Sequence, residues 1–125
     1  MVSVLDSSAA LAVMFQEHGQ ETVLPVMEGA LISSVNAAEA MQVYQRRGNR
    51  PADARSLFQG LGLRVCTFGQ EDASMAAAIG FDAPHLGLGA CACIALARRE
   101  SAGQVLTADS IWAETKLGVK IKLIR

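Results

Sequence analysis

Short runs of apolar residues alternate along the chain with longer stretches in which apolar positions recur at helical spacing. The short runs predict strands at 2–5, 30–33, 63–66, 104–107 and 119–123. The longer stretches predict helices at 7–16, 20–28, 35–47, 52–60, 70–79, 89–99 and 110–116. Strands separated by helices need crossover connections, which favour a mainly parallel sheet covered on both faces. The pattern therefore predicts an α/β fold in three layers (α/β/α), with four to five strands in the sheet.

Glycine and proline mark two breaks in this pattern. Residues 48–51 separate two predicted helices, with Pro51 placed to open the second of them. Residues 80–87 contain a proline and predict a loop. No segment resembles a linker or a repeat, so a chain of 125 residues is expected to form one domain, 1–125.

Composition and charge exclude several classes of protein. With 51% hydrophobic and 18% charged residues, the chain is not disordered, and a net charge of −1 argues against a polybasic nucleic-acid binder. The longest apolar run, 86–97, is shorter than the roughly 20 residues that span a bilayer. No Lys or Arg precedes Arg46, and Asp6 interrupts the first apolar run, which argues against a secretory signal. We expect a soluble, cytoplasmic protein without a membrane partner, whose three cysteines are buried as small apolar residues.

Three acidic residues lie just beyond predicted strands. Asp6 follows the strand at 2–5, Asp109 follows the strand at 104–107, and Glu39 lies on the helix that the strand at 30–33 feeds. The carboxyl ends of parallel strands open onto one edge of a sheet, where ligands bind. Glu39 also shares an apolar stripe with residues four positions away on either side, so its carboxylate should face the fold. Burying an unpaired negative charge is costly, and a bound cation would offset that cost. Mg²⁺ and Mn²⁺ prefer hard oxygen ligands and are the cations that such carboxylates would bind.

Helix capping is the competing interpretation of the same acids. Asp is a favoured N-cap residue, and both Asp6 and Asp109 precede a predicted helix. The spacing of Asn36 and Glu39 also resembles a capping box. Composition and spacing alone therefore predict a metal-binding α/β domain and do not predict a more specific function.

Three blocks that contain these acids resemble a known family. Residues 4–9 (VLDSSA), 32–39 (ISSVNAAE) and 105–112 (VLTADSIW), together with the tail 118–125, are similar to PIN domains of the VapC type, the ribonuclease toxins of toxin–antitoxin pairs. The resemblance covers essentially the whole chain. It implies a metal-dependent endoribonuclease in which Asp6, Glu39 and Asp109 hold Mg²⁺ or Mn²⁺ and activate water. It also implies an RNA substrate, a cognate antitoxin and a homodimer.

One position departs from the family pattern. The fourth block of the family has an aspartate after Leu-Gly, whereas this chain has Ala90 after Gly89. An alanine cannot bind a metal, so the resemblance implies an attenuated or inactive nuclease. Asp82, eight residues earlier, is not expected to substitute. The alanine is either natural, in a degenerate or regulatory member, or a disarming substitution, which the otherwise intact motifs favour.

The remaining candidates carry structural alternatives. Ser7 and Ser34 lie beside acidic residues and could orient a ligand or cap a helix. Arg46, Arg47 and Arg50 could grip RNA phosphates or simply end a helix favourably. Two rival functions are also open. The first is a catalytically dead PIN fold kept as an interaction module. The second, a phosphotransfer enzyme of the haloacid dehalogenase type, requires an aspartate where this chain has Ser8.

Overall fold

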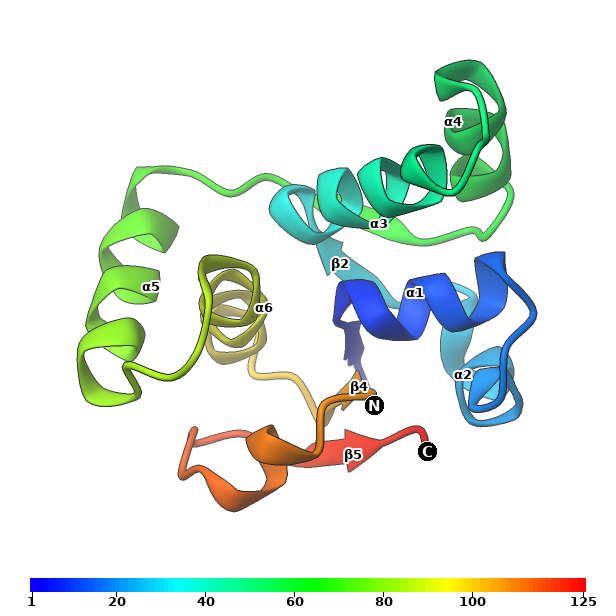
Figure 1. The fold of residues 1–125 in the computed structure, drawn as a ribbon. Helices are drawn as coiled ribbons and strands as arrows, with labels where there is room; N and C mark the ends of the chain where they lie inside the picture. The colour runs from blue at the N-terminus through cyan, green and yellow to red at the C-terminus, as the bar shows by residue number, and fades with distance from the viewer.

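A five-stranded parallel sheet forms the centre of the molecule (Figure 1). The computed structural model describes residues 1–125. The strands are β1 (Ser3–Leu5), β2 (Leu31–Ser33), β3 (Arg64–Cys66), β4 (Gln104–Thr107) and β5 (Ile121–Leu123). They lie in the order β3-β2-β1-β4-β5, and every neighbouring pair is parallel. The predicted α/β class with a parallel central sheet is confirmed.

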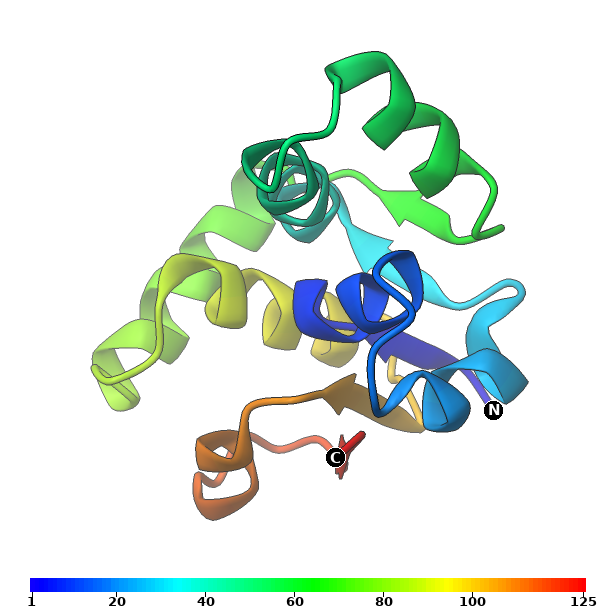
Figure 2. The same cartoon turned by 45° about the vertical axis from the view of Figure 1, so that its right-hand side comes forward.

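Helices connect the strands and cover both faces of the sheet (Figure 2). They are α1 (Ser7–Met14), α2 (Gln20–Met27), α3 (Ser34–Arg46), α4 (Pro51–Gln59), α5 (Gln70–Asp82), α6 (Leu88–Arg99) and the 3₁₀ helix η1 (Ser110–Glu114). In Figure 1, α5 and α6 lie on one side of the sheet and α1 and α2 on the other. None of these helices is long and apolar enough to cross a membrane.

Neighbouring residues of each central strand enter different parts of the core. Val4 packs with α5 and α6, whereas Leu5 packs with α1 and α2. Val105 and Leu106 divide between the same two clusters. Since side chains alternate across a strand, both faces of the sheet must be covered, and the central strands are buried throughout.

The start of α4 and the end of α5 can be compared with the glycine and proline signals in the sequence. Pro51 is the first residue of α4, and Gly48 adopts a positive φ of 97° in the preceding break, as expected. The predicted end of α5 is wrong, because the first three residues of the predicted loop at 80–87 belong to the helix. Gly80 stays helical where α5 approaches Cys91 of α6, and α5 ends at Asp82, ahead of Pro84. Asp82 is thus the last residue of a helix, not part of a loop.

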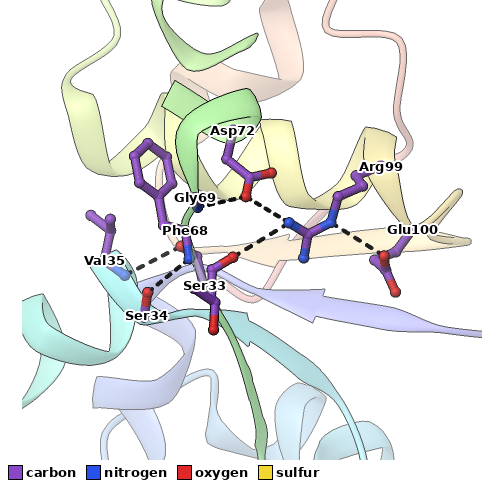
Figure 3. Close-up of polar contacts among 9 residues, drawn as sticks. Ser33, Ser34, Val35, Phe68, Gly69, Asp72, Arg99 and Glu100 are labelled. Atoms are coloured by element: carbon purple, nitrogen blue, oxygen red, sulfur yellow. Dashed lines mark hydrogen bonds and ion pairs between the residues drawn. The ribbon is translucent and has the colours of Figure 1, made fainter. Parts of the chain in front are cut away.

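The link between β3 and α5 is held by polar contacts on both sides (Figure 3). The backbone N–H of Phe68 donates to Ser34 Oγ at 3.0 Å, which ties the link to the start of α3. Asp72 accepts from the N–H of Gly69 at 2.8 Å and pairs with Arg99 of α6 at 2.6 Å. This carboxylate therefore caps α5 and joins it to α6.

Candidate functional site

Asp6 lies at the carboxyl end of β1, where it is 7% exposed. It occupies the N-cap position of α1, yet its side chain makes no capping bond. Its Oδ2 accepts instead from the hydroxyls of Ser8 at 2.7 Å and Thr107 at 2.9 Å. Asp6 therefore does not form the capping bond that its position suggests, because its hydrogen bonds go to two hydroxyls.

The same two hydroxyls join the ends of β1 and β4. Ser8 Oγ accepts from the N–H of Ala108 at 2.9 Å, and Thr107 Oγ1 accepts from the N–H of Asp109 at 3.1 Å. Each hydroxyl thus accepts a hydrogen bond from a backbone N–H just after β4 and donates its own hydrogen to Asp6. The arrangement fixes one oxygen of Asp6, while Oδ1 has only a long contact of 3.5 Å from Ser7 Oγ.

No Lys, Arg or His side chain pairs with this buried carboxylate. None of the ion pairs in the structure involves Asp6, Glu39 or Asp109. Burial raises the pKa of Asp6, and hydrogen bonds from the Ser8 and Thr107 hydroxyls and from the backbone of Ser7 and Ser8 oppose the rise only in part. A buried acid without a positive partner is costly, which makes this edge of the sheet attractive to a cation.

Glu39 is seated against α6 by Asn36 and Gly89. The Nδ2 of Asn36 donates to Glu39 Oε1 at 3.0 Å and to the carbonyl oxygen of Gly89 at 2.9 Å. A Cβ on Gly89 would overlap both carboxylate oxygens of Glu39, so the acid occupies the space that a side chain would fill. The predicted capping box is wrong, because Ser33 is the N-cap of α3 and Asn36 lies inside the helix.

The buried Cys93 of α6 lies within electrostatic reach of both Asp6 and Glu39. Its thiol is fully buried, and burial together with the negative charges of Asp6 and Glu39 raises its pKa well above the usual range. Ala90 precedes Cys93 by three residues on α6, which places both on one side of that helix. Residue 90 therefore lies on the same side of α6 as Cys93 and directly follows Gly89, which contacts Glu39.

Asp109 is exposed and has a structural task. Its Oδ1 accepts from the N–H of Ile111 at 3.1 Å and caps η1. The capping alternative is confirmed for this residue, although its backbone is tied to Asp6 through Thr107. Asp6 and Asp109 thus share one edge of the sheet, one turned inward and the other outward.

The donor chemistry of this edge fits a divalent cation with an incomplete set of protein ligands. No group of three or more His, Cys, Asp or Glu side chains is close enough to hold a metal ion. Two carboxylates suffice for Mg²⁺, however, which commonly keeps several waters and binds substrate phosphates. The buried Oδ1 of Asn36, which has no donor, adds a free acceptor beside Glu39 that ordered water could satisfy.

The remaining sequence candidates lie around this edge. Ser7 makes only its long contact with Asp6, and Ser34 is occupied with the N–H of Phe68. Arg46, Arg47 and Arg50 are exposed near the end of α3 and the start of α4. The guanidinium of Arg47 lies 4.2 Å from the centre of the Phe15 ring, so this residue also has a packing role.

An open apolar groove of about 460 Å³ lies between α3, α4 and β3. Ala37, Met41, Phe58 and Val65 supply its apolar surface. Arg55 is the only charged residue that lines it. Elsewhere on helices α1–α4, most of the large apolar side chains are buried or half-buried, whereas Leu24 is 48% exposed.

Comparison with known proteins places this arrangement in a family. The family model for the PIN domain matches residues 3–117. The chain belongs to the PIN domain family. That part of the resemblance drawn from the three sequence blocks is thereby confirmed. No curated protein matches the sequence of this PIN domain significantly.

Solved structures share the fold at low sequence identity. A toxin–antitoxin complex from Klebsiella pneumoniae superimposes with a TM-score of 0.78 at 14% identity, covering 98% of both chains. DNA-bound VapBC from Salmonella typhimurium gives 0.76 at 17% identity, covering 100% of this chain and 99% of the other. The sarcin–ricin loop cleaving toxin VapC20 of Mycobacterium tuberculosis gives 0.73 at 12% identity, covering 90% and 93%.

Several residues of this PIN domain site were not among the site residues expected from the sequence. Ser8 and Thr107 hold Asp6, and Asn36 holds Glu39. The signal for Thr107 was its place two residues before Asp109 at a strand end. Asn36 gave a weaker signal, because its partner Gly89 is 53 residues away in the chain.

Proposed function

We propose that this PIN domain is a toxin of the VapC type, a metal-dependent endoribonuclease that hydrolyses RNA phosphodiester bonds and acts in the cytoplasm. The observation that carries the proposal is Asp6, buried at the carboxyl edge of the sheet without a cationic side chain as its partner. Family membership and the fold shared with VapBC complexes and VapC20 support it.

Asp6, Glu39 and Asp109 are the acids proposed to hold Mg²⁺ or Mn²⁺. When bound, such an ion supplies a more acidic water and neutralises phosphate charge. Ser8 and Thr107 keep one oxygen of Asp6 fixed and leave the other available. Ser7 Oγ lies 3.5 Å from that second oxygen and is proposed to orient a water there. Ser34 supports the site indirectly, through the link that follows β3.

Ala90 makes this chain attenuated or inactive in the proposed mechanism. An aspartate at this position would directly follow Gly89, which contacts Glu39, in a structure where fewer than three ligands converge. The alanine withholds that carboxylate. Metal affinity and cleavage rate are both expected to suffer.

Arg46, Arg47 and Arg50 are proposed to contact the RNA backbone. Arg46 follows Glu39 by seven residues, or about 10 Å along the helix and on the same side of it. A phosphate one or two nucleotides from the scissile bond lies within such reach. Neutralising any one of these arginines should weaken RNA binding similarly for all sequences.

A cognate antitoxin and a second copy of this chain are the proposed protein partners. The VapBC complexes that share this fold support the antitoxin. The apolar groove between α3, α4 and β3 is proposed to bind an amphipathic segment of the antitoxin, with a carboxylate of that segment pairing with Arg55. The homodimer rests on the family resemblance.

Cleavage of total RNA by the Ala90→Asp variant tests the proposed activity. We expect metal-dependent cleavage at least about a hundredfold faster than that of the parent chain, because the missing ligand is restored. Ala90→Asn is the matched control, since it has the same shape without the charge, and should remain slow. If Ala90→Asp cleaves RNA no faster than Ala90→Asn with either Mg²⁺ or Mn²⁺, the proposed mechanism is wrong.

A catalytically dead interaction module is the second candidate function. Ala90 and the absence of three converging ligands favour it. This candidate predicts that Asp6→Asn leaves binding of the antitoxin unchanged and that Ala90→Asp creates no activity. The nuclease proposal predicts activity in Ala90→Asp that Asp6→Asn then abolishes.

A further inference from the structure

Asn36 is a buried amide between an acid of the site and the backbone of a different helix. Its side chain is fully buried, with 0% of its surface exposed. Its Nδ2 donates to Glu39 Oε1 at 3.0 Å and to the carbonyl oxygen of Gly89 at 2.9 Å. Both partners are acceptors, so the amide nitrogen must face them, and the orientation of the side chain is settled by its surroundings.

Gly89 completes the contact from the side of α6. A side chain at this position would overlap the carboxylate of Glu39, so only glycine lets the acid lie directly against the helix backbone. One proton of the Asn36 amide then holds the carboxylate, and the other holds the carbonyl of the residue that the carboxylate touches. The three residues form a closed unit, here called the Glu39 seat.

We propose that Asn36 and Gly89 are positioning residues that fix the carboxylate of Glu39 for metal binding. The inference rests on the proposed function, because it assigns a purpose to the geometry of one proposed ligand. A flexible glutamate loses rotamer entropy when it binds an ion, and a carboxylate held in advance has already lost it. Residues that orient a metal ligand in this way commonly change metal affinity by about 10- to 100-fold when they are replaced.

Position in the fold adds to this interpretation. Gly89 directly precedes Ala90, where an aspartate is expected in the family pattern. The bond from Asn36 to the Gly89 carbonyl therefore also sets where residue 90 lies relative to Glu39. In a chain with an aspartate at 90, the Glu39 seat would fix the position of two metal ligands relative to each other: Glu39 on α3 and the aspartate at position 90 on α6.

The test is a double-mutant cycle on Mn²⁺ affinity in the Ala90→Asp chain. Asn36→Ala should weaken Mn²⁺ binding about tenfold in the presence of Glu39, and less than twofold once Glu39→Ala has removed the carboxylate. Asn49→Ala is the matched control, because Asn49 makes a similar bond to the Tyr44 carbonyl at 3.0 Å, far along α3 from the site. It should change the affinity less than twofold.

Gly89→Ala serves as the second variant, since it leaves the buried amide intact and displaces only the carboxylate. It should weaken Mn²⁺ binding as Asn36→Ala does, and again only while Glu39 is present. An affinity within twofold of the parent for both variants would overturn the inference. So would equal losses with and without Glu39, which would indicate a general effect on the fold.

A crystal structure without metal separates this inference from the proposed function. If the Ala90→Asp chain binds no Mn²⁺, the proposed function fails, and the seat is then judged from the Glu39 side chain alone. We expect one ordered conformation in Asn49→Ala and a displaced or disordered carboxylate in Asn36→Ala. A carboxylate that stays in place in Asn36→Ala would refute the positioning role.

Discussion

Asp6 and Asp72 are buried to nearly the same degree, with 7% and 8% of their surface exposed, yet their surroundings differ. Asp72 pairs with Arg99 at 2.6 Å and caps the start of α5 through the N–H of Gly69. Asp6 pairs with no Lys, Arg or His side chain and makes no capping bond, and the side-chain hydrogen bonds that it accepts come from hydroxyls. One acid is neutralised by the fold, whereas the other keeps its charge uncompensated.

This difference separates an acid that stabilises the fold from one that is available to a ligand. The bonds of Asp72 account for its burial, because a charged hydrogen bond and a cap each favour the folded state. Burial of Asp6 raises its pKa and opposes folding at neutral pH. A site that costs stability in this way is typical of function.

Asp72→Ala should produce the largest loss of stability among the substitutions that probe this comparison. Removing the carboxylate deletes the cap of α5 and leaves Arg99 with only its longer bonds to Glu100 and the Thr67 carbonyl, which should lower the free energy of unfolding by about 2 kcal/mol. Glu71→Ala, at the exposed neighbouring position, should stay within about 0.5 kcal/mol of the parent. Urea denaturation of both variants measures the difference, and equal effects would show that Asp72 is not the structural acid described here.

Ser8→Ala should have a smaller but distinct cost. Its hydroxyl donates to Asp6 at 2.7 Å and accepts from the N–H of Ala108 at 2.9 Å, so its loss should lower the free energy of unfolding by about 1–2 kcal/mol at neutral pH. Ser7→Ala removes only a contact of 3.5 Å and should stay within about 0.5 kcal/mol. The same denaturation measurement decides the point, and a Ser7→Ala loss as large as that of Ser8→Ala would reverse the assignment.

Asp6→Asn should change stability least, and in the opposite direction. Because the pKa of Asp6 is raised in the folded state, its contribution to stability is fully present below the unfolded pKa of about 3.9 and is lost as the pH rises through the folded pKa. The amide variant does not ionise and avoids that loss. Its Tm should exceed that of the parent at pH 7, and the gap should close toward pH 3.5. A lower Tm for Asp6→Asn at pH 7 would contradict the description of Asp6 as an uncompensated acid.

The sheet and its acidic edge could be predicted because their signals are local. Short apolar runs bounded by helical patterns indicate buried parallel strands, and the residue after each strand follows from the chain itself. The end of α5 could not be placed in this way. Gly80 favours a break by its own propensity, but packing of α5 against Cys91 keeps it helical.

The details of the site depend on contacts between distant segments. Asp6 and Asp109 have the same sequence signature of a helix cap, yet only Asp109 caps. What distinguishes them is that Asp6 accepts from the hydroxyls of Ser8 and Thr107, and Thr107 lies 101 positions from Asp6 in the chain. The role of Asn36 depends likewise on Gly89, so no local pattern could have revealed it.

Titration with Mn²⁺ by calorimetry, comparing Ala90→Asp with Ala90→Asn, tests the central claim most directly. If Asp6, Glu39 and Asp109 form a metal site that lacks one ligand, the aspartate should bind Mn²⁺ at least about tenfold more tightly than the amide. Adding Asp6→Asn should then remove most of that gain. Equal affinities in Ala90→Asp and Ala90→Asn would contradict the claim and leave the acidic edge without a metal.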